Sequence, residues 1–409
     1  MALNHACLPI PAQAQGKRII ISVRLLSTWN TDFTDKTRSA RIFSAFPCAK
    51  FPSRGEVLKF KYSCNSGFIR EIRVLLGDDL TRIVLDAMGS DRHPIPEIEA
   101  AILAVRTLDC EIILTGPEDR LRSQIAEAGA ESVRIAHAPD VFTMTDHLSS
   151  DDLRRGVTSM AVGLELVKSG EADAFVTMGN TGGAMANALF KLGRIRGVKR
   201  PALTALFPVK TGRCVVLDIG ANAECKPEYL VQFARMGSVY ASSVLGVKRP
   251  RVGLLSNGEE AGKGNELVKA AYPLLEGSSL NFIGNVEGKE LFAGEADVVV
   301  MDGFTGNVLL KSIEAVAKLL VDSIRENMMK TTLTKIGGLL ARPAFSEVRR
   351  MLDPAEVGAV PLLGIDGLIF VGHGRSEAKA VLSAIRLADQ SVKVGLLQSL
   401  KAEIEKGFK

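Results

Sequence analysis

The chain has 409 residues, of which 46% are hydrophobic and 24% are charged, and this balance excludes a disordered polymer or a fibrous protein. The net charge of +5 is unevenly spread, because residues 1–82 carry +7 and the remaining residues carry −2. Since most of the chain is not basic, we do not expect a nucleic-acid partner. The six cysteines show no paired spacing, which fits a reducing cytoplasm and predicts no zinc site.

Residues 1–82 are rich in Ser, Thr, Lys, Arg and Phe and show no sustained helical or strand period, so we expect a weakly ordered N-terminal extension. Three explanations are open: an organelle transit peptide, an added interaction arm, and a coding sequence begun too far upstream. We favour the last because a regular pattern begins abruptly at Arg82. We therefore expect the native protein to start between residues 74 and 82.

From residue 83 to residue 409, short apolar runs alternate with amphipathic segments. The runs predict strands within 82–89, 110–116, 132–138, 172–180, 202–208, 214–222, 251–258, 280–288, 296–304 and 367–374. The amphipathic segments predict helices at 94–108, 157–168, 227–245, 307–326 and 376–401. This alternation predicts one three-layer α/β/α domain with a mostly parallel sheet, whose ligand site lies beyond the carboxyl ends of the strands.

The segment at about 325–352 interrupts this rhythm. It has a net charge of +4 and an apolar stripe at helical spacing that includes Ile336, Leu339 and Leu340, with Lys335 beside it. A basic amphipathic helix of this kind favours either loose contact with an anionic membrane surface or packing in a dimer interface or against its own domain.

Glycine-bearing polar turns follow six of the predicted strands. In "GNTGG", Asn180, Thr181 and Gly182 begin a helix, whose free N–H groups are suited to an anion. The other five turns are "DAMGSDRHP", "DIGANAECK", "SNGEEAGKG", "DGFTGN" and "GHGRS". We expect all six to converge on one edge of the sheet. The sequence contains no GxGxxG, GxxxxGK[ST], GxSxG or HExxH motif, so these nucleotide, hydrolase and zinc sites have no marker.

These motifs resemble those of the bacterial phosphate acyltransferases of phospholipid synthesis. The matching blocks are "LDAMGSD", "GNTGG", "LDIGANAECKPEYLVQFARMG", "VGLLSNGEEAGKG", "FIGNVEGKELFAGEADVVVMDGFTGNVLLK" and "VPLLGIDGLIFVGHGRSEAKAV", in family order from residue 83 to about 390. The family's first block usually has a glycine where this chain has Ser90, and Arg92 and His93 also depart from it. The extension has no counterpart.

The resemblance implies transfer of a fatty acyl group from acyl-acyl carrier protein to inorganic phosphate, giving acyl phosphate for a downstream glycerol-3-phosphate acyltransferase. It also implies a fold related to the phosphotransacetylases and to the isocitrate and isopropylmalate dehydrogenases. A cytoplasmic homodimer loosely attached to the inner membrane face, with no metal and no other cofactor, is expected.

The chemistry of the reaction suggests which residues act. Phosphate is already an anionic nucleophile, so the site needs hydrogen-bond donors and cations rather than a covalent intermediate. We expect Lys311, His373 and Asn307 to be catalytic, with Lys263 as the alternative source of charge. The predicted substrate-binding residues are Gly89, Asn180, Thr181, Gly182, Asn222, Lys263, Gly303, Thr305 and Gly306.

Three other functions are open at this point. A short-chain phosphate acetyl- or butyryltransferase would use coenzyme A, and an NAD-dependent dehydrogenase would share the fold but not the chemistry. A membrane-surface adaptor without catalysis rests only on the segment at 325–352.

Overall fold

The protein is described by a computed structural model that covers residues 19–23, 58–63, 69–76, 80–127, 133–142 and 150–406. The chain divides into two compact units, Met1–Leu80 and Thr81–Lys409. In the first unit, β1 (Ile19–Val23), β2 (Leu58–Ser63) and β3 (Ile69–Leu76) form an antiparallel sheet in the order β1-β3-β2. The sequence analysis assigned no strands there. Thr81 and Arg82, the last residues of the predicted extension, belong to the second unit. Apart from these, Leu80 and the three strands, the predicted extension lies outside the described residues, and its origin stays a prediction.

The second unit is built on a sheet of eleven strands in the order β11-β10-β12-β9-β8-β13-β14-β7-β4-β5-β6. The strands are β4 (Thr81–Asp86), β5 (Cys110–Gly116), β6 (Arg134–His137), β7 (Ala174–Thr177), β8 (Ala202–Val209), β9 (Gly212–Leu217), β10 (Arg251–Leu255), β11 (Asn281–Val286), β12 (Val298–Val300), β13 (Ala359–Leu363) and β14 (Leu368–Gly372). All ten predicted strands are present, and seven of the ten neighbouring pairs are parallel. The prediction of a mostly parallel sheet is confirmed.

The strand that the sequence analysis missed, β13, changes the topology. It pairs antiparallel with both β14 and β8, and β8 pairs antiparallel with β9. The strands β4, β5, β6, β7 and β14 therefore run in one direction, and β9, β10, β11 and β12 run in the opposite direction. A proline at position 361 weakened the strand signal of β13, because proline is depleted in strands.

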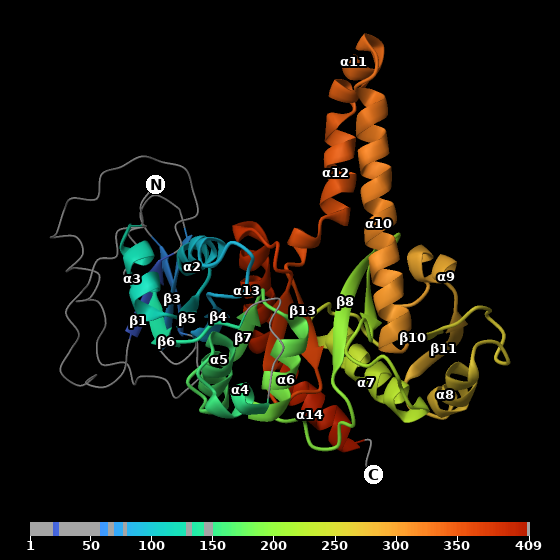
Figure 1. Cartoon of the computed structure of the whole chain (residues 1–409), viewed down its shortest axis with the longest axis horizontal. Helices are drawn as coiled ribbons and strands as arrows, with labels where there is room; N and C mark the ends of the chain where they lie inside the picture. The colour runs from blue at the N-terminus through green and yellow to red at the C-terminus, as the bar shows by residue number, and fades with distance from the viewer. Residues whose placement is uncertain are drawn as a thin grey trace. The chain divides into compact units, whose positions relative to one another are not determined.

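The helices of the second unit cover both faces of this sheet (Figure 1). They are α2 (Ile95–Thr107), α3 (Glu118–Glu127), α4 (Ser150–Arg155), α5 (Ser159–Lys168), α6 (Thr181–Lys191), α7 (Pro227–Ser243), α8 (Glu266–Glu276), α9 (Gly288–Ala293), α10 (Gly303–Met328), α11 (Thr332–Leu340), α12 (Arg342–Leu352), α13 (Ala378–Lys393) and α14 (Leu396–Lys406), with a 3₁₀ turn at Pro354–Glu356. The single helix predicted at 376–401 is wrong. It is two helices, because Gly395 adopts φ 66° between α13 and α14.

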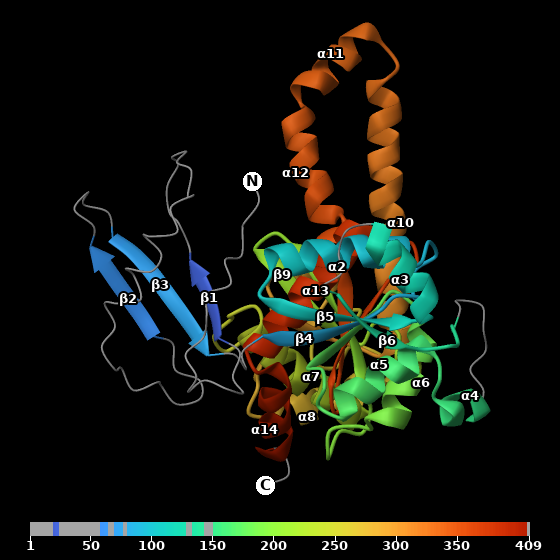
Figure 2. The same ribbon diagram turned by 90° about the vertical axis from the view of Figure 1, so that its left-hand side faces the viewer.

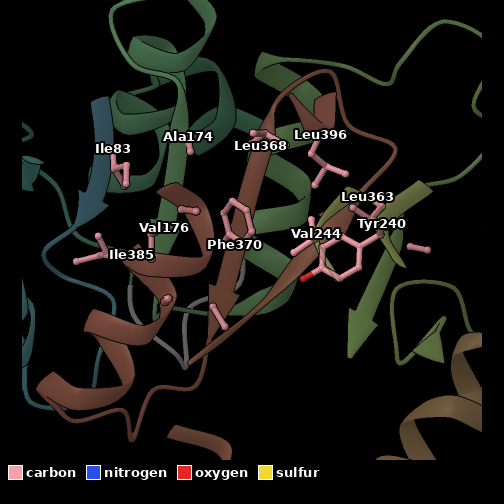
Figure 3. Close-up of a cluster of buried hydrophobic side chains, with 14 of the residues drawn as sticks. Ile83, Ala174, Val176, Tyr240, Val244, Leu363, Leu368, Phe370, Ile385 and Leu396 are labelled. Carbon is pink, nitrogen blue, oxygen red and sulfur yellow. The ribbon is translucent and has the colours of Figure 1, made fainter. Parts of the chain in front are cut away.

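Alternating residues of the strands feed two hydrophobic clusters, one on each face. In β4, Ile83 and Leu85 join the cluster beneath α2, α7, α13 and α14, whereas Val84 joins the cluster beneath α5, α6 and α10. Figure 3 shows part of the first cluster, where Phe370 and Tyr240 pack among aliphatic side chains. Burying one such large side chain stabilises the fold by about 2–3 kcal/mol, and the two clusters together confirm the three-layer architecture.

Helices α10, α11 and α12 form a hairpin that stands away from the sheet (Figures 1 and 2). Helix α10 has 26 residues and is therefore about 39 Å long, and only its first part packs against the body of the unit. The prediction of helices at 325–352 is confirmed by α11 and α12. Among the described residues, no helix is both long enough and apolar enough to cross a membrane.

Candidate active site

The polar turns lie in two groups rather than one. Turns after β4, β7 and β14 lie at one edge of the sheet, and turns after β9, β10 and β12 lie at the other, because these two sets of strands run in opposite directions. The expectation that all six turns converge on one edge is therefore wrong. Its physical cause is the antiparallel pairing of β8 with β9. Strand β13 is antiparallel to both of its neighbours, so β14 and β8 still run in the same direction.

In the first group, the turns after β4 and β7 are in direct contact. A Cβ atom on Gly89 would lie 2.7 Å from the backbone nitrogen of Gly179, so only glycine fits between them. Behind the turns, the buried Oδ2 of Asp86 accepts a 2.7 Å hydrogen bond from the Thr177 hydroxyl. Burial raises the pKa of Asp86, although the hydroxyls of Thr177 and Ser159 act against this. Asp86 thus orients the two turns.

Helix α6 begins at the turn after β7 with an open amino end. Asn180 is its N-cap, and the Asn180 side-chain oxygen accepts a 2.9 Å hydrogen bond from the N–H of Gly183. Thr181 and Gly182 are exposed, and within the described residues their backbone N–H groups have no acceptor. Two free N–H groups at the positive end of a helix form an anion-binding geometry.

The turn after β14 completes the first group. The carbonyl oxygen of Gly374 accepts a 2.7 Å hydrogen bond from the N–H of Asp91, which joins this turn to the one after β4. His373 and Arg375 are both exposed there. Arg375 makes no ion pair with any described carboxylate. Arg375 belongs to the motif "GHGRS" but was not among the predicted site residues. Its position two residues after His373 could have indicated it.

In the second group, one carboxylate organises the turn after β9. Asp218 is buried, and its Oδ1 accepts hydrogen bonds from the N–H groups of Leu203, Gly220 and Ala221 at 3.0–3.2 Å. Its Oδ2 accepts from the backbone N–H and the side-chain amide of Asn222, at 2.7 and 2.9 Å. Burial raises the pKa of Asp218, and these donors oppose that effect.

Helix α10 begins beside this turn with an amino end that is mostly closed. The N–H of Gly303 donates to the carbonyl of Asn222 at 2.8 Å, and the N-cap Asp302 accepts from both the N–H and the hydroxyl of Thr305. Gly306 packs against the carbonyl of Asp218. The structure therefore uses Gly303, Thr305 and Gly306 to join two turns, whereas the sequence analysis expected them to bind phosphate.

Helix α10 also connects the two groups of turns. Asn307 lies against the Gly220 turn, with its Cβ 3.8 Å from the position of a Cβ on Gly220. Seven residues later, Oε1 of Glu314 is 3.9 Å from Nε2 of His373 in the first group. Lys311 occupies the same helical face between Asn307 and Glu314 and is exposed. Asn307 and Glu314 are about 10 Å apart along the helix axis, so α10 places Asn307, Lys311 and the Glu314 partner His373 along one helical face.

Two predicted contributors are placed elsewhere. Lys263 lies in the turn after β10, where the Asn257 side chain accepts a 2.9 Å hydrogen bond from the N–H of Gly264. Within the described residues, no hydrogen bond joins this turn to α6 or to Lys311. The side-chain amide of Asn222 is already used, because it donates to Asp218 and to the carbonyl of Pro201.

One cluster of carboxylates within the described residues has the spacing of a metal site. It consists of Glu259, Glu287 and Glu290. The Lys289 ammonium lies 2.9, 3.4 and 3.1 Å from these three carboxylates, so a protein cation neutralises the cluster.

Comparison with known proteins identifies the family. A family model described as fatty acid synthesis protein matches residues 81–399. A phosphate acyltransferase from Elusimicrobium minutum is 47% identical over 326 residues, covering 79% of this chain and 96% of the relative. The chain belongs to the phosphate acyltransferase family. A further phosphate acyltransferase, from Thermus thermophilus, is 46% identical over 324 residues, covering 79% of this chain and 98% of the relative. The family match contains every polar turn described above.

Solved structures agree with this phosphate acyltransferase assignment at the level of the fold. A phosphotransacetylase from Streptococcus pyogenes matches with a TM-score of 0.52 and 16% identity, covering 77% of this chain and 95% of that chain. A branched-chain phosphotransacylase from Enterococcus faecalis matches with a TM-score of 0.50 and 14% identity, covering 76% and 99%. The predicted relation to the phosphotransacetylase fold is confirmed.

Proposed function

We propose that the protein transfers a fatty acyl group from acyl-acyl carrier protein to inorganic phosphate. The product, acyl phosphate, then serves a glycerol-3-phosphate acyltransferase in phospholipid synthesis. Family membership supports the reaction type. The observation in the structure that supports the proposal is the amino end of α6, where the N–H groups of Thr181 and Gly182 have no acceptor within the described part of the chain and are available to an anion.

Phosphate binds at the amino end of α6, with the Gly89 turn packed against it. Two features favour this end over that of α10. Its N-cap, Asn180, is neutral, and its first two N–H groups have no acceptor among the described residues. The amino end of α10 instead carries Asp302 as its cap, and a carboxylate beside a phosphate dianion is repulsive.

The transfer needs one bond to form and one to break. A phosphate oxygen attacks the carbonyl carbon of the thioester, the carbon–sulfur bond breaks, and the electron pair leaves with sulfur as a thiolate. A thiol with a pKa of about 8.5 is a good leaving group, and the thiolate then takes a proton from solvent. No enzyme nucleophile is required, so catalysis consists of positioning and of stabilising the oxyanion.

The residues that α10 brings together supply these contributions. Lys311 offsets the charge of phosphate, and the Asn307 amide donates a hydrogen bond toward the oxyanion. His373 contacts the substrate and is positioned by Glu314. Arg375 adds a second cation on the same turn as His373.

A trapping assay tests the reaction. The protein is mixed with hexadecanoyl-acyl carrier protein and phosphate, and hydroxylamine converts any acyl phosphate to a hydroxamate. Hydroxamate formed only in the presence of phosphate supports the proposal. Activity with acetyl-coenzyme A alone indicates the short-chain transferase. Reduction of NAD indicates the dehydrogenase. The absence of turnover with every donor indicates the non-catalytic membrane-surface adaptor.

The hairpin supports a cytoplasmic enzyme at the inner membrane face or in a homodimer. In α11, Ile336, Leu339 and Leu340 are 55%, 68% and 77% exposed, so this face does not pack against its own domain. It binds either an anionic membrane surface, with Lys335 toward the headgroups, or a second copy of the chain. Flotation with anionic vesicles and sedimentation of the protein alone, each compared between the wild type and Leu339→Glu, separate these two cases.

A further inference from the structure

A basic cavity lies at the edge of the sheet where β9 ends and β8 begins. Its volume is about 570 Å³. The residues that line it are Leu189, Arg194, Lys199, Arg200, Pro201 and Tyr229. Three of these are cations, and the other three give the cavity apolar walls.

The cations of this cavity have no carboxylate partner. Arg194, Lys199 and Arg200 are exposed, and none of them makes an ion pair with a carboxylate in the part of the chain that the structure describes. The guanidinium of Arg194 donates to the carbonyl of Lys199, which holds the loop around the cavity. The neighbouring segment has two exposed carboxylates, Glu224 and Glu228, and one exposed cation, Lys226, so the local balance stays positive when the three cations of the cavity are included. The cavity therefore favours an anionic ligand.

The cavity adjoins the candidate active site through one side chain. The Asn222 amide donates to the carbonyl of Pro201, which lines the cavity, and to Asp218 at 2.9 Å. The carbonyl of Asn222 in turn accepts from Gly303 at the start of α10. Leu189, which also lines the cavity, belongs to α6. It lies eight residues, or about 12 Å along the helix axis, from Thr181.

We infer that this cavity and its cations dock the carrier protein that delivers the acyl thioester. The inference rests on the proposed function and assigns the surface to which the acyl donor, acyl-acyl carrier protein, binds. A carrier whose surface is acidic, and whose prosthetic arm contains a phosphodiester, matches the three cations. The apolar walls formed by Leu189, Pro201 and Tyr229 suit the rest of the arm. Leu189 places the cavity about 12 Å along the axis of α6 from Thr181, and Pro201 connects the cavity through Asn222 to the start of α10. A thioester on an arm that extends along α6 reaches phosphate at the amino end of this helix.

The experiment compares two variants with the same change in charge. Lys199→Glu/Arg200→Glu reverses the charge at the cavity but leaves Arg194, which holds the loop. Lys168→Glu/Lys269→Glu reverses two exposed lysines on α5 and α8 and is the control. We expect the cavity variant to raise KM for hexadecanoyl-acyl carrier protein by about tenfold or more, because electrostatic complementarity guides docking. Its KM for phosphate should stay within about twofold of the wild type, and the control should match the wild type in both.

A second measurement does not depend on turnover. Wild-type binding of the carrier protein with a free arm should weaken as salt is raised from about 50 to about 300 mM, and the cavity variant should lose most of this dependence. Melting curves check that both variants are folded.

Each other outcome overturns the inference. An unchanged KM for the carrier places docking elsewhere. An equal rise in KM for phosphate makes the cavity an anion subsite. A change in sedimentation of the cavity variant shows that a second copy covers the cavity. Absence of phosphate-dependent product from the wild type overturns the proposed function instead, so the two failures are distinguishable.

Discussion

Helices α6 and α10 both follow a buried strand, and both begin with a polar N-cap and nearby glycines. Asn180 caps α6 and Asp302 caps α10. In α10 the first N–H is used by the carbonyl of Asn222, whereas in α6 the first two N–H groups have no acceptor in the described part of the chain. The sequence pattern "GxTG" is thus used once to present an anion-binding end and once to fasten two loops together.

The surrounding charges separate the two helix ends further. Two carboxylates, Asp218 and Asp302, lie at the amino end of α10, and their hydrogen bonds hold its turns in place. Behind α6 lie Asp86 and Glu97, whose pKa values are both raised by burial. Burial also raises the pKa of Asp218, so the buried carboxyls do not distinguish the two helix ends. The caps do distinguish them: Asn180 is neutral and Asp302 has a carboxyl group, so an anion is repelled less at α6 than at α10.

A matched pair of substitutions can break this comparison. Gly182 and Phe304 are each the second residue of their helix, and both are exposed. Gly182→Asp should lower kcat/KM for phosphate by about 1,000-fold, or roughly 4 kcal/mol, because it places a carboxylate where phosphate binds. Phe304→Asp should change it by less than about threefold. Steady-state kinetics at varied phosphate measures both.

The controls keep backbone effects apart from charge. Gly182→Ala and Phe304→Ala place the same uncharged side chain at both positions. The kcat/KM for phosphate of both variants should remain within about tenfold of that of the wild type. An acidic residue in the first turn favours the helix, so the aspartate variants should stay folded. Equal losses at the two helices would remove the distinction between an open and a closed end.

The cation on α10 sharpens the comparison from the opposite side. Lys311→Gln should lower kcat/KM for phosphate by about 30-fold, or roughly 2 kcal/mol, because Lys311 lies on the helical face between Asn307 and Glu314. Lys318→Gln, an exposed lysine farther along the same helix, is the control and should have no effect. A Lys311→Gln variant with wild-type kinetics would show that α10 contributes only structure.

The layers of the fold could be predicted from the sequence, but the directions of the strands could not. The alternation of apolar runs and helices determines the layers, because β4 sends Ile83 and Val84 to opposite faces by the period of a strand. It did not show that the antiparallel pairing of β8 with β9 reverses half of the sheet, because an apolar run alone does not reveal the direction in which its strand pairs. Pro361 also obscured β13, the strand that joins β8 to β14.

The roles of the glycine turns were hidden for a related reason. Whether the N–H of Gly303 is free depends on the carbonyl of Asn222, a residue 81 positions earlier that belongs to another strand end. Propensity and capping rules describe neighbours within one turn and carry no information about such a partner. The sequence therefore allowed the residues of α6, Asn307 and His373 to be selected by residue type. Their positions relative to one another became visible only in the folded structure.

The buried Glu97 gives the smallest effect and tests the charge behind α6. It lies on α2, where its Oε1 accepts a 3.0 Å hydrogen bond from the N–H of Ser90, and burial raises its pKa to about 7. A carboxyl with a pKa raised on folding binds its proton more tightly in the native state. Its contribution to stability is therefore present at low pH and is lost as the pH rises through about 7.

Glu97→Gln removes this titration while keeping the hydrogen-bond acceptor for Ser90. The free energy of unfolding of the variant, relative to the wild type, should rise by about 1 kcal/mol between about pH 6 and about pH 8. Urea unfolding at the two pH values measures it. Glu99→Gln, an exposed position on the same helix, should show no such change. If the two variants respond to pH alike, Glu97 is charged throughout this range and adds a negative charge close to the Ser90 turn.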